Sequence, residues 1–142
     1  MEPNKKGGMQ MKVAVTAKGS NPDAAVDPRF GRCSFFLIFD TDTMAYEALE
    51  NSNAQAGGGA GISSAQLVVD HGVDCVLTGN CGPKAFRVLA EADIDVVVGC
   101  SGRAGDVVAQ YKNGALSATS QPNVNSHFGT SASVGVGPGT QE

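Results

Sequence analysis

The sequence has no tryptophan, only two histidines, and no pair of cysteines spaced C-x-x-C. The missing cysteine pair leaves no basis for a thioredoxin-like motif or a zinc ribbon. The histidines, His71 and His127, do not suggest a Ser/His/Asp set, since His127 lies in the polar C-terminal segment. The strand-like run Val13 to Thr16 carries no carboxylate on which a metal-dependent nuclease centre could be built. We therefore expect a protein that is not an enzyme.

Long apolar runs and runs of Lys or Arg are also missing. Stretches such as Ile94 to Cys100 fall far short of the roughly 20 apolar residues that span a bilayer. No apolar stretch follows Lys5 and Lys6, as a secretory signal would require. The formal net charge of −4 argues against broad binding to nucleic acid. We expect a cytoplasmic protein with no membrane and no nucleic-acid partner.

The length of 142 residues fits one domain. Residues 1–10 are polar and contain glycine, so we predict a flexible leader ahead of a domain at residues 11–119. Residues 120–142 are rich in Gly, Ser, Thr and Pro, a composition typical of a flexible tail. His127 in this tail is most simply a solvated side chain, although a tail that folds down could bring it to a metal.

Short apolar runs predict strands, and runs with helical spacing and end signals predict helices. Each strand-helix-strand crossover forces its two strands parallel, and the turn Asp40 to Thr43 joins an antiparallel hairpin. We therefore predict an α/β fold, a five-stranded mixed sheet with one antiparallel strand and flanking helices. The predicted strands are 11–16, 35–39, 44–49, 73–78 and 94–99, with 115–119 as an optional edge strand. The predicted helices run from Ile62 to His71-Gly72, from 83 to 92 and from 104 to 112.

These strand directions place several loops at one edge of the sheet. Cys33 comes just before the antiparallel strand, and Cys81 and Cys100 follow two parallel ones. The segment Asn51 to Gly61 reaches the same edge. Because ligands of open α/β sheets usually bind outside the carboxyl ends of the parallel strands, we expect the working surface here.

The segment Asp27 to Cys33 combines a rigid Asp-Pro turn with two arginines. Arg29 and Arg32 can offer forked donors to an oxyanion or to the sulfides of a cluster. A structural loop with solvated arginines is the alternative, and the residues alone favour neither.

The four cysteines are expected to be thiols in a reducing compartment. Cys81 lies just ahead of the helix predicted at 83–92, whose dipole is expected to lower the pKa of its thiol and make it a soft-metal ligand. The alternative is a small residue that fills a tight turn. Cys100 occupies the equivalent turn one strand on, where Arg103 could add charge. Cys75, inside an apolar strand, is expected in the core.

The run Gln55 to Gly61 could present backbone N–H groups to a phosphate. It lacks the G-K-[ST] ending of a P-loop and the G-x-G-x-x-G spacing. It is therefore a weak nucleotide signal, and a flexible lid is the simpler interpretation.

Four stretches carry a family resemblance: Met11-Lys12-Val13-Ala14-Val15, Val26-Asp27-Pro28-Arg29-Phe30-Gly31-Arg32 followed by Phe35 to Asp40, Thr78-Gly79-Asn80-Cys81-Gly82-Pro83-Lys84-Ala85-Phe86, and Gly99-Cys100-Ser101-Gly102. Together they resemble the dinitrogenase iron-molybdenum cofactor biosynthesis family. This is the NifX/NafY type of domain, also found at the C-terminus of NifB and in the small orange protein. The resemblance runs from Met11 to about Tyr111. It implies a ribonuclease H-like three-layer fold and the binding, carriage or protection of a metal–sulfur cluster.

We therefore predict a non-enzymatic carrier of an Fe-S, Fe-Mo-S or Mo-Cu-S cluster or its precursor. Its expected partners are cluster donor or acceptor proteins, and its expected state is a monomer or weak homodimer. The alternative is a regulatory or scaffold domain that docks onto a partner protein or binds a small phosphate-bearing ligand through the glycine run. The predicted cofactor-binding residues are Arg29, Gly31, Arg32, Cys33, Asn80, Cys81, Gly82, Cys100, Ser101 and Gly102, with Cys33, Cys81 and Cys100 as metal ligands.

Overall fold

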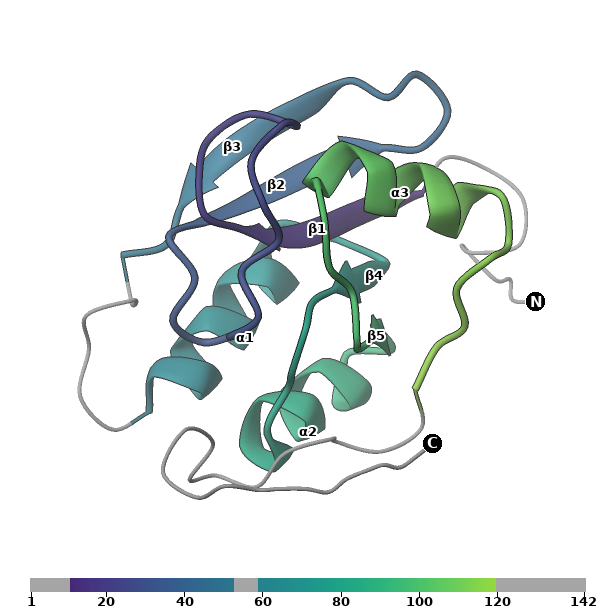
Figure 1. The fold of residues 1–142 in the computed structure, drawn as a ribbon. Helices are drawn as coiled ribbons and strands as arrows, with labels where there is room; N and C mark the ends of the chain where they lie inside the picture. The colour runs from purple at the N-terminus through teal and green to yellow at the C-terminus, as the bar shows by residue number, and fades with distance from the viewer. Residues whose placement is uncertain (1–10, 53–58, 120–142) are drawn as a thin grey trace.

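The computed structural model describes residues 11–52 and 59–119, so the predicted leader and tail and most of the glycine run lie outside the described residues. One sheet has helices on both faces, with α1 and α2 on one side and α3 on the other (Figure 1). The strands are β1 (Lys12–Ala17), β2 (Phe35–Asp40), β3 (Tyr46–Glu50), β4 (Cys75–Leu77) and β5 (Asp95–Val97). The helices are α1 (Ala60–Asp70), α2 (Pro83–Glu91) and α3 (Ala104–Lys112). Within this part of the chain, no helix combines the length and apolarity needed to cross a membrane.

The strand order in the sheet is β3-β2-β1-β4-β5. β1 pairs in parallel with β4, and β4 with β5, whereas β2 is antiparallel to both β1 and β3. β1 is central and covered on both faces, which explains its unbroken apolar run Val13-Ala14-Val15. The predicted α/β fold with a five-stranded mixed sheet is confirmed. The ribonuclease H-like designation stays a prediction.

Side chains of successive strand residues point to opposite faces, so the sheet divides the core into two clusters. Ala14 and Phe36 lie in the first cluster with Val68 of α1 and Leu89 of α2. The second cluster lies under α3 and is formed by, among others, Val13, Val15, Leu37, Phe39, Val107 and Val108. A rim side chain that points into the core therefore packs either under α1 and α2 or under α3, but not in both clusters.

The hairpin between β2 and β3 is confirmed, but β3 begins two residues later than predicted. Met44 has a positive φ of 63°, and its N–H donates to Asp40 O at 2.7 Å, so it belongs to the turn. The side chain of Asp40 accepts from Asp42 N at 2.8 Å, which is the local bond that makes Asp a turn former. The optional edge strand at 115–119 is reduced to one bridge, in which Thr119 N donates to Val96 O at 2.6 Å.

Candidate cofactor-binding site

Three loops meet at the edge of the sheet where β1, β3, β4 and β5 end and β2 begins. We call this edge the rim and define it as Asp27 to Cys33, Thr78 to Gly82, Gly99 to Arg103, and Asn51. Backbone hydrogen bonds join the loops: Phe30 N donates to Asn80 O at 3.2 Å, Gly99 N to Gly79 O at 2.8 Å, and Val26 N to Gly102 O at 2.8 Å. The convergence predicted from the strand directions is confirmed.

Two glycines let the loop Asp27 to Cys33 lie directly on its neighbours. A Cβ atom on Gly79 would lie 2.6 Å from Pro28 Cα, and a Cβ atom on Gly31 would lie 2.8 Å from Gly61 Cα. Both distances are shorter than any normal contact, and both neighbours are backbone atoms. Any larger residue would push this loop away from the turn after β4 or from the first turn of α1.

Arg29 has a structural partner as well as an exposed surface. Its Nε lies 3.3 Å from Asp27 Oδ1 and its Nη2 lies 3.4 Å from Asp27 Oδ2. The Asp27 side chain is 2% exposed and the Arg29 side chain 53%. Arg29 therefore compensates a buried carboxylate, which would be costly without a cation, and still presents more than half of its surface to solvent. Arg32 is exposed at the same loop.

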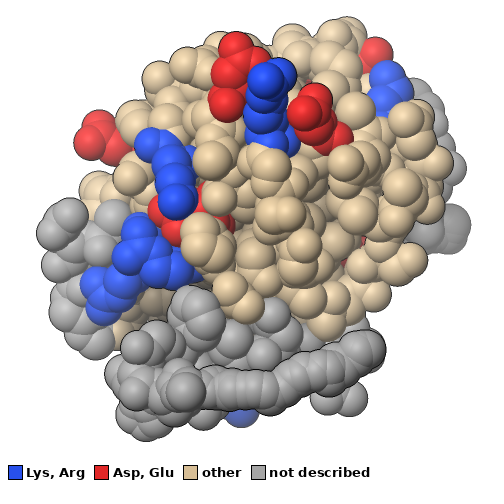
Figure 2. All heavy atoms as spheres, viewed as in Figure 1, with Lys and Arg blue, Asp and Glu red and all other residues tan. Residues whose placement is uncertain are grey.

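Positive charge gathers at the rim. Exposed cations there are Arg29, Arg32 and Arg103, with Lys84 in the first turn of α2. Figure 2 shows Lys and Arg side chains on the left of the view, near the end of the sheet where β3 ends in Figure 1, with Asp or Glu atoms between them. Together the cations form a surface that favours an anion.

Helix ends add to this charge. All the described helices begin on the rim side, at the caps Gly59, Gly82 and Arg103, and none of these caps makes a side-chain hydrogen bond. Among the described residues, the first turns of α1 and α2 also have no acidic side chain, although α3 has Asp106. The first two N–H groups of α3, those of Ala104 and Gly105, already donate to Ala24 O and Pro22 O. Because N–H groups at a helix N-terminus carry partial positive charge, α1 and α2 reinforce the cationic character of the rim.

The predicted cysteines lie at the rim, but their side chains do not meet. Cys33 and Cys81 enter the core on the α1/α2 face, whereas Cys100 enters on the α3 face. Cys33 and Cys81 are 0% exposed and Cys100 is 8% exposed. Within residues 11–52 and 59–119, no group of three Cys, His, Asp or Glu side chains could hold a metal ion. In this conformation the sheet separates the Cys100 thiol from those of Cys33 and Cys81, and ligation by all three stays a prediction that requires the loops to move.

The predicted low pKa of the Cys81 thiol is wrong. Burial raises the pKa of Cys81 to about 12 and the pKa of Cys100 to about 11, the latter in spite of a hydrogen bond from the backbone at Thr78. Burial and the nearby Asp27 carboxylate also raise the pKa of Cys33. A helix dipole contributes only about 0.3–1 kcal/mol, less than one pKa unit, so desolvation outweighs it. At neutral pH these thiols are protonated.

The other predicted residues mainly hold the loops together. Asn80 Nδ2 donates to Pro28 O at 3.1 Å, and Gly82 caps α2. Gly102 accepts from Val26 at its carbonyl, and its φ of 98° suits glycine. Ser101 is exposed at the rim.

Sequence reasoning missed a set of buried polar side chains beneath the rim. Thr16 Oγ1 donates to Asp27 O at 2.7 Å and lies 2.9 Å from Thr78 Oγ1. On the same α1/α2 face of the sheet, Asn51 Nδ2 donates to Cys33 O at 2.9 Å, and Ser64 Oγ donates to Gly31 O at 3.0 Å. The burial of Ser64 could have been predicted, because Ser64 lies four residues before Val68 and therefore on the same apolar face of α1.

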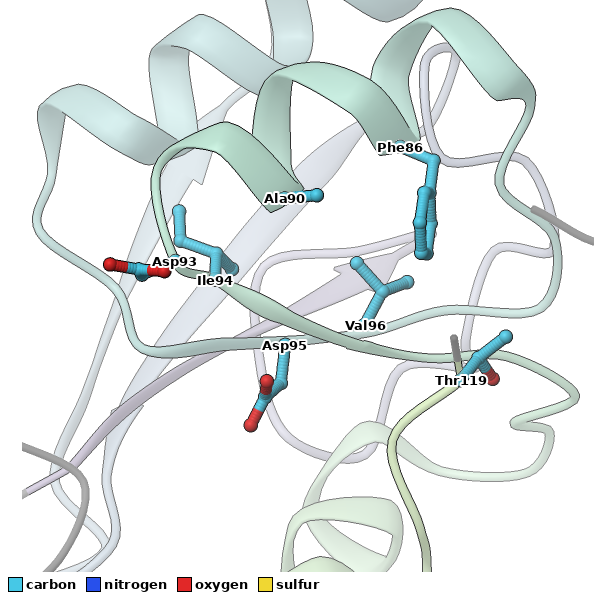
Figure 3. A pocket seen from close by; sticks show the side chains of 7 residues that line it. All are labelled: Phe86, Ala90, Asp93, Ile94, Asp95, Val96 and Thr119. Atoms are coloured by element: carbon cyan, nitrogen blue, oxygen red, sulfur yellow. The ribbon is translucent and has the colours of Figure 1, made fainter. Parts of the chain in front are cut away.

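A groove of about 260 Å³ lies away from the rim, between α2 and β5 (Figure 3). In that view the Phe86 ring extends from α2 towards Val96 and Thr119. The groove is therefore a separate feature of the edge strand. Its lining residues are Phe86, Ala90, Asp93, Ile94, Asp95, Val96 and Thr119.

Comparison with known proteins places residues 11–114 in the family described as "Dinitrogenase iron-molybdenum cofactor". Uncharacterized protein MJ0580 of Methanocaldococcus jannaschii is 33% identical over 89 residues, which are 61% of this chain and 72% of that protein. The apo form of the orange protein from Desulfovibrio gigas is 36% identical with a TM-score of 0.79, covering 82% of this chain and 99% of that one. A proposed NifB protein of the DUF35 family from Thermotoga is 30% identical with a TM-score of 0.67, covering 76% of this chain and 92% of that one.

Proposed function

Because the chain belongs to the dinitrogenase iron-molybdenum cofactor family, we propose that it binds, carries or protects a metal–sulfur cluster or its precursor without transforming it. The observation that carries this proposal is the cationic rim, where exposed arginines and helix N-termini face the same edge of the sheet. Metal–sulfur clusters with bridging and terminal sulfides are commonly anionic. Such an anion is the ligand that this arrangement favours.

The rim supports capture through hydrogen bonds and charge before any thiolate bond forms. Arg32 and the exposed part of Arg29 can donate to sulfides, while burial keeps the thiols of Cys33, Cys81 and Cys100 protonated. Direct ligation by a cysteine would first require its loop to open and its thiol to lose a proton. The cluster could be an Fe-S, Fe-Mo-S or Mo-Cu-S species, and donor and acceptor proteins are its proposed source and destination.

Anaerobic titration tests the proposal. The full chain is titrated with tetrathiomolybdate, alone and with copper(I), and with preformed iron–sulfur species, and binding is followed by visible absorption. We expect saturable binding that Arg32→Gln weakens about ten-fold, a loss typical of one charge-assisted contact. The matched control is Lys112→Gln, which removes an exposed cation from the last turn of α3, away from the rim.

Two outcomes would count against the proposal: no binding by the unmodified chain, or binding that Arg32→Gln and Lys112→Gln weaken equally. A triple Cys33→Ser, Cys81→Ser, Cys100→Ser variant then tests ligation separately. Unchanged affinity in the triple variant would remove the cysteines as ligands while leaving the cationic rim in place.

The alternative function, a regulatory or scaffold domain that binds a phosphate-bearing ligand, has less support. Residues 53–58 of the glycine run lie outside the described residues. The described part of that run is Gly59 to Gly61, at the N-terminus of α1, where a phosphate is favoured. A nucleotide arm in a thermal-shift assay discriminates the two functions. The alternative would be favoured if a nucleotide raised the Tm and metal–sulfur species left it unchanged.

A further inference from the structure

Asn51 and Ser64 form a pair, here called the clasp, that ties one half of the arginine loop to the ends of β3 and α1. Asn51 Nδ2 lies 2.9 Å from Cys33 O, 3.4 Å from Gly31 O and 3.8 Å from Cys33 Sγ. Ser64 Oγ lies 3.0 Å from Gly31 O and 3.3 Å from Asn51 Oδ1. The backbone of Asn51 adds a further bond, since its N–H donates to Ser34 O at 2.9 Å.

These bonds bracket Arg32. The clasp holds the carbonyl groups of Gly31 and Cys33, which are the residues immediately before and after Arg32. An arginine whose backbone is fixed on both sides has fewer orientations to lose when it donates to a ligand. Because these bonds hold the backbone on either side of Arg32, their effect on Arg32 is one of position.

The same bonds also cover the Cys33 thiol. Asn51 is 4% exposed and Cys33 is 0% exposed, so neither group is reached by bulk solvent while the clasp is closed. The Asn51 amide contributes to the clasp with both of its polar atoms: Nδ2 donates to Cys33 O, and Oδ1 lies within hydrogen-bond distance of Ser64 Oγ. No apolar side chain of similar size could replace it.

The Arg29 half of the loop is held by other groups. Asp27 binds both Arg29 and the hydroxyl of Thr16, and Asn80 binds Pro28 and Phe30. Breaking the clasp should therefore loosen Arg32 and Cys33 while Arg29 stays in place.

We infer that Asn51 is a positioning residue, which with Ser64 sets the place of Arg32 and keeps the Cys33 thiol covered until this half of the loop opens. The effect on Arg32 rests on the proposed function, because it matters for binding only if the rim takes an anion. The effect on Cys33 is a property of the fold alone.

Site-resolved alkylation tests the cover over Cys33. Folded protein is treated with iodoacetamide, and the labelling rate of each cysteine is read by peptide mass spectrometry. We expect Asn51→Ala to accelerate labelling of Cys33 by about ten-fold and Ser64→Ala to accelerate it less, because each removes bonds of the clasp. Both should leave the labelling rate of Cys75 unchanged. Asn113→Ala, at the far end of α3, is the matched control and should change none of the rates.

An unchanged Cys33 rate in Asn51→Ala would overturn the inference, and so would an equal acceleration at all four cysteines, which would mean global loosening. The binding arm uses tetrathiomolybdate with copper(I). We expect Asn51→Ala and Arg32→Gln each to weaken binding and the double variant to be little worse than Arg32→Gln alone. Fully additive losses would contradict positioning through Arg32. If the unmodified chain binds no cluster, the proposed function fails, but the labelling rates still decide whether the clasp covers Cys33.

Discussion

At the rim, cations and helix N-termini face the same way, whereas at the opposite edge of the sheet carboxylates gather around helix C-termini. The opposite edge is defined here by Asp70 at the end of α1, Asp74 before β4, Asp93 after α2 and Asp95 at the start of β5. In the part of the chain that the structure describes, α1 and α2 also have no basic residue in their last turns. Positive charge is therefore concentrated at the rim and negative charge at the opposite edge, so the charge of the molecule is separated along the direction of its strands.

This polarity runs against the usual stabilisation of helices. Acidic residues stabilise helix N-termini and basic residues stabilise C-termini, so α1 and α2 give up favourable charge at both ends. α3 has the conventional arrangement, with Asp106 in its first turn and Lys112 in its last. The comparison suggests that the first turns of α1 and α2 are kept free of carboxylates where an anion would bind. Helix α3, whose face holds Cys100 alone of the three rim cysteines, is under less of this constraint.

The largest expected effect comes from the close approach at the rim. Gly79→Ala would place a Cβ atom 2.6 Å from Pro28 Cα, and because both atoms are backbone-bound, the arginine loop would have to shift. We expect the free energy of unfolding to fall by about 2–3 kcal/mol, the upper part of the range for overpacking, because the contacted atom belongs to the backbone. Urea unfolding measures the loss.

The control for this glycine is Gly61→Ala. A Cβ atom there would meet Ala85 Cβ at 3.5 Å, which is an ordinary contact, and the position is helical. We expect no loss of stability, since alanine is the better helix former. Equal losses in the two variants would contradict the assignment of the effect to the contact between Gly79 and Pro28.

The two edges should also differ in pH dependence. Folding raises the pKa of Cys81 to about 12 and of Cys100 to about 11, against about 8.5 for an unfolded thiol. A raised pKa stabilises the folded state below pH 8.5, and this contribution is lost as pH rises towards 11–12. At pH 9.5, each buried thiol should lower the free energy of unfolding by about 1.4 kcal/mol relative to its value well below pH 8.5. Cys81→Ala should flatten the fall in stability between pH 8.5 and 10.

At the opposite edge the titrating group is Tyr111. Burial raises the pKa of its phenol, with further contributions from Cys75, including a side-chain hydrogen bond, and from Asp95 and Asp74. An unfolded tyrosine titrates near pH 10, so its contribution is present below about pH 10 and is lost above it. Tyr111→Phe also removes the hydrogen bond to Cys75, which shifts stability at every pH. In urea unfolding at pH 7 to 11, the pH dependence of its stability should therefore run parallel to that of the parent protein below pH 9 and diverge only above pH 10. A difference that begins at pH 8.5 would contradict the assignment of the two pH ranges to the two edges.

The strand directions were predictable from sequence because each crossover and hairpin allows only one relative direction. The faces that the rim side chains enter were not. Cys81 and Cys100 follow their strands by several residues, where the two-residue alternation of a strand no longer applies. The clasp was equally hidden, since Asn51 and Ser64 contact residues 18 and 33 positions away through side chains.

Helix α1 shows the same limit within one element. The predicted apolar face included Ile62, which is 43% exposed, whereas the polar Ser64 is fully buried. Helical periodicity identified α1 and its end at Gly72, but the first turn is oriented by its contact with Gly31 and the clasp. Local pattern therefore predicts the element, and long-range contacts with the arginine loop decide which residues at its start are buried.

The smallest expected effect tests the polarity with one matched pair of acids. Asp70→Asn removes a charge at the C-terminus of α1 but keeps the oxygen that accepts from Gln66 Nε2 at 3.0 Å. It should stabilise the fold by about 0.3–0.5 kcal/mol at low ionic strength, while Asp106→Asn in the first turn of α3 should destabilise it by a similar amount. Urea unfolding at low and high salt measures both, and salt should shrink both because the charges are exposed. Changes of the same sign would mean that helix dipoles do not account for the difference between the two edges, and the cationic character of the rim would then rest on its arginines alone.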